Sequence, residues 1–322
     1  MNSPGLKIAV PKVFAAELER ELAIPHSLAI ISDQSDAEIA RLLSATDVLV
    51  SGAFTRAWRD PLGCALRLVH SSGAGTDGID FASLPPGCTV CNVYGHERGV
   101  AEQAFMVMLA LQRNLFGLDR ALRQGDWTQD RPYVPELRGR NLLILGLGHI
   151  GQELVRWGQF FGMNPTALTR SHSPQRSEKL GLHASGGLGE LGGQLKEADF
   201  VVVAIPATAG TTDLIGEAEF ALMKPTAFIV NVGRAAVINE AALFRALQTR
   251  RIAGAGLDVW YQYPAAGQKL LPGRLPFQEL DNVIMTPHKP TIETMAYRWK
   301  KIADNLHRFA RGDALDNVVA VV

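Results

Sequence analysis

The stretch from Asn141 to Gly151, Asn-Leu-Leu-Ile-Leu-Gly-Leu-Gly-His-Ile-Gly, constrains the fold more than any other part of the sequence. A short apolar run of strand length leads into three glycines, and a helical pattern of apolar residues follows. In such a unit Gly146 permits the tight turn, Gly148 lets a pyrophosphate approach the backbone, and Gly151 lets helix and strand pack closely. We therefore predict a dinucleotide site, against the alternative of a turn whose glycines serve only packing.

Apolar runs of strand length alternate with amphipathic helical segments on both sides of this unit. Strands are expected at 6–10, 27–31, 47–51, 66–70, 89–93, 142–145, 166–169, 199–205, 227–232, 253–259 and 283–286, and helices at 15–23, 36–43, 99–123, 239–250 and 291–311. This alternation predicts an α/β fold with parallel sheets covered on both faces. Because the last helix is expected to return to the first unit, we predict a dinucleotide-binding domain of residues 99–289 nested within a domain of residues 1–98 plus 290–322.

The charge balance and the lengths of the apolar runs restrict the kind of molecule that the chain is expected to bind. With 32 Lys and Arg against 32 Asp and Glu, the chain has no net charge to draw it to nucleic acid or to an anionic membrane. No apolar run approaches membrane-spanning length, so a cytoplasmic protein acting on a small molecule is expected. Cys88 and Cys91 form a C-x-x-C within a strand pattern, which favours buried thiols over a redox or zinc site, and no metal site is expected.

A second Gly-rich turn, Ser71 to Asp77, follows the expected strand 66–70. Open α/β sheets bind ligands at the carboxyl ends of their strands, and successive N–H groups in such a turn form a nest for an anion. We expect either a substrate carboxylate there or an ordinary flexible turn.

The residues after the expected strand 166–169 indicate which nicotinamide cofactor binds. NAD-binding versions carry an acidic residue there, which bonds the adenosine ribose. Here the sequence reads Thr169-Arg170-Ser171-His172 and has no carboxylate. Arg170 is suited to a bidentate pair with a 2′-phosphate, and Thr169 and Ser171 to hydroxyl hydrogen bonds with it. NADP(H) is therefore predicted as the preferred cofactor, with NAD(H) possible; a solvated basic loop is the alternative.

Three motifs lie where expected strands end: Asn231-Val-Gly-Arg234, Gly256-Leu-Asp258-Val and Thr286-Pro-His288. Reduction of a 2-oxo acid needs a cation that holds the carboxylate and polarises the carbonyl, and an acid that protonates the developing alkoxide. Arg234 suits the first role and His288 the second.

Taken together, these motifs resemble the D-2-hydroxyacid dehydrogenase family, specifically its glyoxylate and hydroxypyruvate reductase branch. Ser72-Gly-Ala-Gly75-Thr-Asp77, Val100-Ala-Glu102, Leu137-Arg-Gly139 and the motifs above follow in family order. The resemblance implies a flavodoxin-like substrate domain around a Rossmann-like cofactor domain, and dimers formed through the cofactor domains. It also implies that Ala74 and Gly75 bind the substrate carboxylate through their N–H groups. The implied cofactor-binding residues are Gly146, Gly148, His149, Ile150, Gly151, Thr169, Arg170, Ser171, Ile205, Pro206, Val232, Gly233 and Asp258.

The sequence departs from the family at three places near the expected site, one of which is Ala235, where Gly is usual after the Arg. Most members have a Glu that pairs with the catalytic His five residues after the Asp of Leu-Asp-Val, where this chain has Tyr263. A neutral phenol orients an imidazole by hydrogen bonding but gives little charge stabilisation to imidazolium. His96 stands where Asn is frequent, and either contacts substrate or nicotinamide or caps the following helix.

The leading interpretation is a reductase that transfers hydride from NADPH to a small 2-oxo acid such as glyoxylate or hydroxypyruvate, giving a D-2-hydroxy acid. Formate dehydrogenases resemble this family and have a neutral Gln at the Glu position, so formate oxidation is one alternative. A non-catalytic NAD(P)H-sensing protein is the other, because loss of the Glu partner is also what a decaying active site shows.

Overall fold

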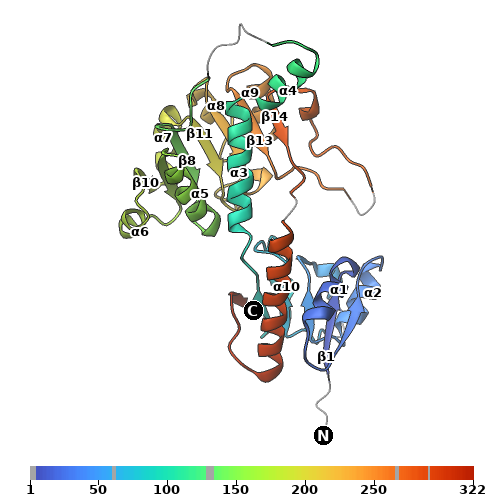
Figure 1. Cartoon of the computed structure of the whole chain (residues 1–322). Coiled ribbons are helices and arrows are strands. Elements are labelled where there is room, and N and C mark those ends of the chain that lie inside the picture. The colour runs from blue at the N-terminus through green and yellow to red at the C-terminus, as the bar shows by residue number, and fades with distance from the viewer. Residues whose placement is uncertain (1–4, 60–62, 128–133, 265–267, 289–290) are drawn as a thin grey trace. The chain divides into compact units, whose positions relative to one another are not determined.

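The computed structural model describes residues 5–59, 63–127, 134–264, 268–288 and 291–322. The chain, which Figure 1 colours from blue at the N-terminus to red at the C-terminus, divides into two compact units. Unit 1 consists of residues 1–96 and 291–322, and unit 2 of residues 97–290. Unit 2 is therefore one continuous segment that interrupts the sequence of unit 1. Within the described ranges, no helix combines the length and the apolar character needed to cross a bilayer.

The described part of unit 1 contains a six-stranded sheet in the order β15-β7-β5-β3-β1-β2. Neighbouring strands are parallel except β15, which pairs antiparallel with β7 at the edge. The order around β1 is that of flavodoxin-like sheets. The strands are β1 (Leu6–Val10), β2 (His26–Ile30), β3 (Val48–Val50), β5 (Leu68–His70), β7 (Thr89–Cys91) and β15 (Val318–Val321), with a separate parallel pair of β4 (Ala53–Phe54) and β6 (Gly78–Ile79).

Helices cover both faces of this sheet. Successive residues of β1 point to opposite sides, and each side packs against different helices. Ile8 packs with Leu18 of α1 and Trp299 of α10, whereas Ala9 packs in the cluster that contains Leu43 of α2. The bounds are α1 (Lys12–Glu21), α2 (Asp36–Leu43) and α10 (Ile292–Arg311), and 3₁₀ turns lie at Arg56–Trp58 and Phe81–Ser83.

The described part of unit 2 contains a seven-stranded, fully parallel sheet in the order β10-β9-β8-β11-β12-β13-β14. The strand order reverses between β8 and β11, which makes the carboxyl ends of these two strands the switch point where doubly wound sheets bind ligands. The strands are β8 (Asn141–Leu145), β9 (Asn164–Thr169), β10 (Ala184–Gly187), β11 (Phe200–Val203), β12 (Phe228–Asn231), β13 (Gly254–Leu257) and β14 (Val283–Met285).

Alternating residues of β8 divide unit 2 into two apolar layers. Leu142 and Ile144 pack with α3 and α5, which Figure 1 shows on the same side of the sheet, and Leu143 and Leu145 pack in the layer of α7, α8 and α9. The helices are α3 (Glu97–Gln112), α4 (Leu115–Arg123), α5 (His149–Phe160), α6 (Pro174–Lys179), α7 (Leu191–Glu197), α8 (Glu217–Leu222) and α9 (Glu240–Gln248), with 3₁₀ turns at Leu188–Glu190, Ala235–Val237 and Phe277–Glu279.

The prediction of one helix from Gly99 to Arg123 is wrong. α3 ends at Gln112, and α4 begins at Leu115, so that Arg113 and Asn114 separate the two helices. Asn114 has φ 48° and ψ 44°, a left-handed conformation that Asn adopts at smaller cost than most residues. Periodicity did not reveal the break, because apolar residues continue at helical spacing through it. α3 is partly buried in the core, whereas α4 buries none of its residues.

Several elements have no counterpart in the sequence prediction. β10 reads Ala-Ser-Gly-Gly and lacks the β-branched residues that mark a strand. The helices α6, α7 and α8 are six or seven residues long, too short for a repeating apolar face. β15 is an antiparallel edge strand, so the expected strict alternation of parallel strands and helices fails at the carboxyl end of the chain.

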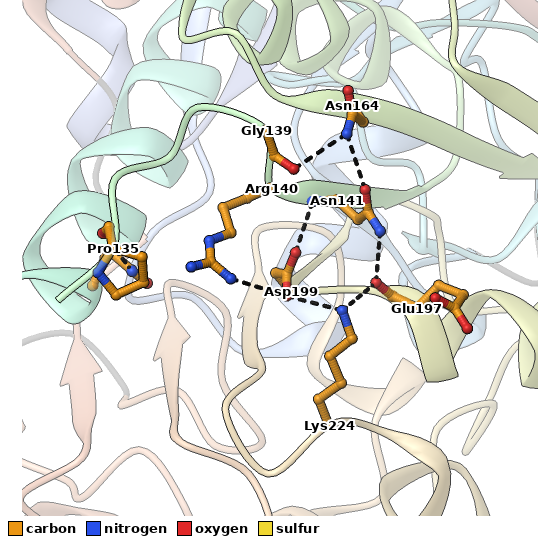
Figure 2. A network of polar contacts seen from close by, with 9 residues as sticks. Pro135, Gly139, Arg140, Asn141, Asn164, Glu197, Asp199 and Lys224 are labelled. Atoms are coloured by element: carbon orange, nitrogen blue, oxygen red, sulfur yellow. Dashed lines mark hydrogen bonds and ion pairs between the residues drawn. The ribbon is translucent and has the colours of Figure 1, made fainter.

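A polar network joins the amino ends of three strands in unit 2 (Figure 2). The Asp199 carboxylate accepts a hydrogen bond from the backbone N–H of Asn141 at 2.9 Å and one from Lys224 Nζ at 3.0 Å. Asn141 Nδ2 and Lys224 Nζ both donate to the Glu197 carbonyl, at 2.9 and 2.7 Å. Asn164, at the start of β9, donates from Nδ2 to Asn141 Oδ1 at 3.2 Å. These hydrogen bonds connect the strands at the amino edge of the sheet. The predicted motifs lie at the opposite, carboxyl edge.

Candidate functional site

The three glycines of the central motif connect β8 to α5, and their surroundings fit the expected roles. Gly146 has φ +101°, and a Cβ there would lie 2.7 Å from the Ala204 carbonyl oxygen. A Cβ on Gly151 would lie 2.0 Å from the Gly146 carbonyl oxygen, so only glycine allows this close approach of helix and strand. A Cβ on Gly148 would meet nothing within 4 Å. Gly148 is the N-cap of the twelve-residue α5, so open space lies beside a helix N-terminus, a place suited to a phosphate.

The other cofactor candidates of the central sheet surround this turn. His149 and Ile150 form the first turn of α5. Ile205 follows β11 and lies between two turns, because a Cβ on Gly146 would approach Ile205 Cγ2 to 2.6 Å and one on Gly233 would approach the Ile205 carbonyl oxygen to 2.7 Å. Its neighbours along the sheet are Pro206, which is exposed, and Val232, which is buried and donates from N to the Val203 carbonyl at 3.1 Å.

Thr169 is the last residue of β9, and Arg170 and Ser171 follow it as exposed residues. Gly146 N donates to the Leu168 carbonyl at 2.8 Å, so this basic segment starts directly beside the glycine turn. Thr169 Oγ1 is enclosed and has no hydrogen-bond partner in the part of the chain that the structure describes. Arg170 is thus an exposed cation close to the glycine turn.

Arg234 is held by a turn that Asn231 organises. Asn231 ends β12 and is 1% exposed. Its Oδ1 accepts from Gly233 N at 3.1 Å, and its Nδ2 donates to the Arg234 carbonyl at 3.0 Å. The half-buried Arg234 donates from Nη1 to the Gly233 carbonyl at 2.9 Å. The guanidinium is therefore fixed at the carboxyl edge of the sheet.

His288 lies past the end of β14 in an unusual backbone conformation. Its φ is +51°, which costs a non-glycine residue about 1 kcal/mol. Asp258 Oδ1 accepts from His288 N at 3.2 Å and from Thr286 Oγ1 at 2.6 Å. Trp260 Nε1 donates to the Thr286 carbonyl at 2.7 Å. One carboxylate and one indole thus secure the turn that presents His288, and strain retained in this way is typical of functional positions.

Tyr263, at the position where the family has Glu, contacts the imidazole. Its hydroxyl lies 3.1 Å from His288 Nδ1 and accepts a hydrogen bond from Trp260 N at 3.1 Å. A phenol both donates and accepts, so it pairs with neutral imidazole as a donor and with imidazolium as an acceptor. A carboxylate in its place would only accept.

The second Gly-rich turn, in unit 1, has the geometry of an anion site. Each carbonyl from Gly73 to Gly75 is bound on the protein side, by Val93 N at 3.2 Å for Gly73, by Asn92 Nδ2 at 2.9 Å for Ala74 and by Ser71 Oγ at 2.7 Å for Gly75. Because the N–H of a trans peptide points away from its C=O, the amides of Ala74, Gly75 and Thr76 point the opposite way. None of these three amides donates a hydrogen bond within the described residues. They form a nest suited to a carboxylate.

Two other sequence predictions concern unit 1. His96 is its last residue in the first segment and directly precedes α3, and whether it contacts ligand or caps the helix stays a prediction. Cys88 and Cys91 are fully buried in clusters on opposite faces of the sheet, and burial raises the pKa of both thiols to about 12. This confirms that they are buried thiols. Among the described side chains, no three of His, Cys, Asp or Glu gather as metal ligands would.

The sequence predicted no individual role for four residues that support these groups, although all but Asn92 stand in the turn and motifs named above: Ser71, Asn92, Asn231 and Thr286. Asn231 ends a buried strand, and Ser71 and Asn92 each follow one directly. An Asn at the carboxyl end of a buried parallel strand has few uses except to bond the turn beyond it, and that signal was available for Asn231.

Comparison with known proteins agrees with this geometry. Residues 105–289 match the family model of the D-isomer specific 2-hydroxyacid dehydrogenase NAD-binding domain. A glyoxylate reductase of Thermococcus litoralis is 33% identical over 265 residues, which cover 79% of this chain and 77% of that protein. A D-3-phosphoglycerate dehydrogenase of Methanocaldococcus jannaschii is 34% identical over 288 residues, but this chain spans only 53% of its length.

Among solved structures, the chain is similar to an NADPH-dependent glyoxylate/hydroxypyruvate reductase from Sinorhizobium meliloti in complex with NADP and malonate. The TM-score is 0.81 at 27% identity, over 98% of this chain and 97% of the other. This similarity confirms the Rossmann-like and flavodoxin-like α/β architecture. The chain therefore belongs to the D-isomer specific 2-hydroxyacid dehydrogenases and is an oxidoreductase of that family.

Proposed function

We propose that the chain reduces a small 2-oxo acid of the glyoxylate or hydroxypyruvate kind to a D-2-hydroxy acid, with NADPH as the preferred reductant. The observation that carries the proposal is the imidazole of His288, held at the carboxyl edge of the dinucleotide-binding sheet by Asp258 and contacted by Tyr263. A reduction of this kind needs one proton donor at the carbonyl. His288 suits that role because Asp258 and Tyr263 hold its backbone and its ring in place.

A nicotinamide dinucleotide bound at the glycine turn supplies the hydride. The open space at Gly148 and the amides at the start of α5 fit its pyrophosphate. Arg234 binds the substrate and stabilises negative charge that develops on the carbonyl oxygen, and His288 protonates that oxygen. The amides of Ala74 and Gly75 bind the substrate carboxylate. Asp258 holds the turn of His288 and lies on the nicotinamide side of the site.

The preference for NADPH rests on Arg170. It is exposed beside the glycine turn, the segment 169–172 has no carboxylate, and Arg170 forms no ion pair within the described ranges. The Sinorhizobium relative, which binds NADP, supports the same choice. A fluorescence titration tests it: NADPH should bind more tightly than NADH, and tighter NADH binding would refute the preference.

The function is tested by following NADPH consumption with glyoxylate, hydroxypyruvate, pyruvate and phenylpyruvate in parallel. Turnover should be lost by about a hundredfold or more in His288→Ala. His26→Ala is the matched control, because His26 bonds Glu19 and the Ile24 carbonyl in unit 1 and has no part in the proposed chemistry. Tight NADPH binding without turnover of any acid would instead identify a binding protein.

Oxidation of formate is a second candidate, favoured by one observation. The group that pairs with His288 is the neutral Tyr263, and formate oxidation requires no acceptor for a hydroxyl proton. His96 argues against it, because formate dehydrogenases have Asn at that position. Reduction of NADP by formate, without turnover of oxo acids, would support this reading. D-3-phosphoglycerate belongs in the same screen because of the archaeal relative.

A homodimer is part of the proposal. The apolar side of α4 carries Leu115, Leu118 and Leu122, which are between 41% and 53% exposed. Residues at this spacing share one face of a helix, and a face of three leucines is normally covered. A second copy of the chain is the occupant that the family resemblance implies. Sedimentation should show a dimer, and Leu118→Glu should yield monomers that still bind NADPH.

A further inference from the structure

A side-chain contact connects the basic segment after β9 to the glycine turn. Arg176 in α6 donates from Nη2 to the carbonyl of Leu147, the residue between Gly146 and Gly148. Leu147 is buried, whereas Arg176 is exposed. The guanidinium therefore reaches across the surface to the peptide that joins Leu147 to Gly148.

The helix that carries Arg176 is anchored at both ends. At its start, Ser173 Oγ accepts from Arg176 N at 3.4 Å, and Ser177 Oγ donates to the Ser173 carbonyl at 3.1 Å. At its end, Gln159 Nε2 of α5 donates to the carbonyls of Leu180 and Gly181, both at 2.8 Å. Since α5 begins at the glycine turn, these hydrogen bonds hold α6 in a fixed position relative to that turn.

The contact fixes the direction of an amide. The carbonyl of Leu147 and the N–H of Gly148 belong to the same planar trans peptide and point in opposite directions. A guanidinium that holds the carbonyl on one side turns the Gly148 N–H toward the other. Gly148 is the N-cap of α5, and the space around its Cα is open. The N–H thus belongs to the group of amides that a pyrophosphate would meet.

Arg176 also brings charge to this place. Within the described ranges neither Arg170 nor Arg176 has a carboxylate partner, whereas some other exposed arginines of unit 2 do, such as Arg245 with Glu217 and Arg250 with Asp281. Two guanidinium groups without carboxylate partners beside one Gly-rich turn favour the binding of an anion there. Arg170 is accounted for by a 2′-phosphate, and Arg176 is not.

We propose that Arg176 is a positioning residue for the pyrophosphate of the dinucleotide. It orients the Gly148 amide through the Leu147 carbonyl and adds positive charge at the turn. This inference rests on the proposed dinucleotide binding and assigns separate roles in it to Arg176 and Arg170. Arg176 supports the part that NADPH and NADH share, whereas Arg170 recognises the 2′-phosphate that only NADPH carries.

The test is a fluorescence titration of the full chain with NADPH and with NADH, for wild type, Arg176→Gln, Arg170→Gln and Lys179→Gln. Arg176→Gln should weaken both cofactors by about tenfold and leave their affinity ratio unchanged. Arg170→Gln should weaken NADPH alone and reduce the ratio. Lys179→Gln removes an exposed cation from the same helix and should change neither affinity.

A second readout needs no ligand. The Gly148 amide resonance should shift in Arg176→Gln and stay in place in Lys179→Gln, because only Arg176 bonds the Leu147 carbonyl. Loss confined to NADPH in Arg176→Gln would make Arg176 a 2′-phosphate ligand and overturn the proposal, as would unchanged binding of both cofactors. Wild-type protein that binds neither cofactor would instead refute the proposed function itself.

Discussion

The hydroxyl of Tyr263 lies 3.1 Å from Nδ1 of His288 and at the same time accepts a hydrogen bond from the backbone N–H of Trp260. The phenol therefore has a second hydrogen bond, to the backbone, that does not depend on the imidazole. It fixes the orientation of the ring but contributes no negative charge. Substitutions of Tyr263 can therefore change the orientation of the His288 ring and its proton affinity separately.

Replacing Tyr263 with Glu should raise the pH at which reduction declines by about one unit, because a carboxylate favours the imidazolium that donates the proton. Tyr263→Phe should lower kcat by about tenfold, since the imidazole loses its orienting partner. The pH dependence of kcat/KM measures both effects. Tyr261→Phe is the control: its hydroxyl bonds the Ile238 carbonyl at 2.9 Å, away from His288. A Glu variant with the wild-type pH profile would show that the two groups are not coupled.

Asn92 and Ser71 hold two carbonyls of the nest in unit 1, so their removal should release its amides. We expect Ser71→Ala and Asn92→Leu each to raise KM for the 2-oxo acid by about tenfold while the affinity for NADPH stays the same. Steady-state kinetics with oxo acid and NADPH varied in turn separate the two effects. Ser83→Ala is the matched control, because it removes another buried hydroxyl of unit 1, bonded to Asp80 Oδ2 at 2.7 Å. Equal changes in the control would mean that general destabilisation explains the result.

Positions that depend on immediate neighbours in the chain were predictable from the sequence. Gly146 and Gly151 are required by contacts within one strand, turn and helix, and Arg234 and His288 follow directly from the ends of strands. Contacts between distant segments were not predictable: Asn92 bonds a carbonyl 18 residues away, and Arg176 bonds one 29 residues away. The break at Asn114 was missed for a different reason, since one left-handed residue leaves no mark on a hydrophobic period.

His70 should make the stability of unit 1 depend on pH. It is fully buried, and burial lowers its pKa to about 4. Its Nδ1 lies 2.9 Å from the Ser71 carbonyl and its Nε2 lies 3.0 Å from Asn305 Nδ2, an arrangement that suits the neutral ring protonated on Nδ1. The imidazolium would place an N–H against the Asn305 amide group, so the folded protein resists protonation.

Between pH 6.5 and about 4 the unfolded chain binds a proton at His70 that the folded chain does not, so the free energy of unfolding should fall as pH decreases. The full loss is about 3 kcal/mol and levels off below pH 4. Urea denaturation at pH 7 and pH 5 measures it. His70→Gln should be less stable at neutral pH but should lose less stability on acidification. The same pH dependence in this variant would show that other groups cause it.

Asp199 should matter for stability and not for catalysis, because its network joins the amino ends of the strands, opposite the proposed site (Figure 2). Its carboxylate binds Lys224 and the Asn141 amide and is 14% exposed, so Asp199→Asn should lower the free energy of unfolding by about 1–2 kcal/mol. Asp281→Asn provides the contrast: Asp281 pairs with Arg250, but its side chain is 68% exposed, and exposed pairs contribute less than about 1 kcal/mol. Thermal or urea unfolding should separate the two variants, and both should retain wild-type kcat. A fall in kcat for Asp199→Asn at temperatures where the variant is folded would mean that the two edges of the sheet are coupled, contrary to the separation argued from their positions.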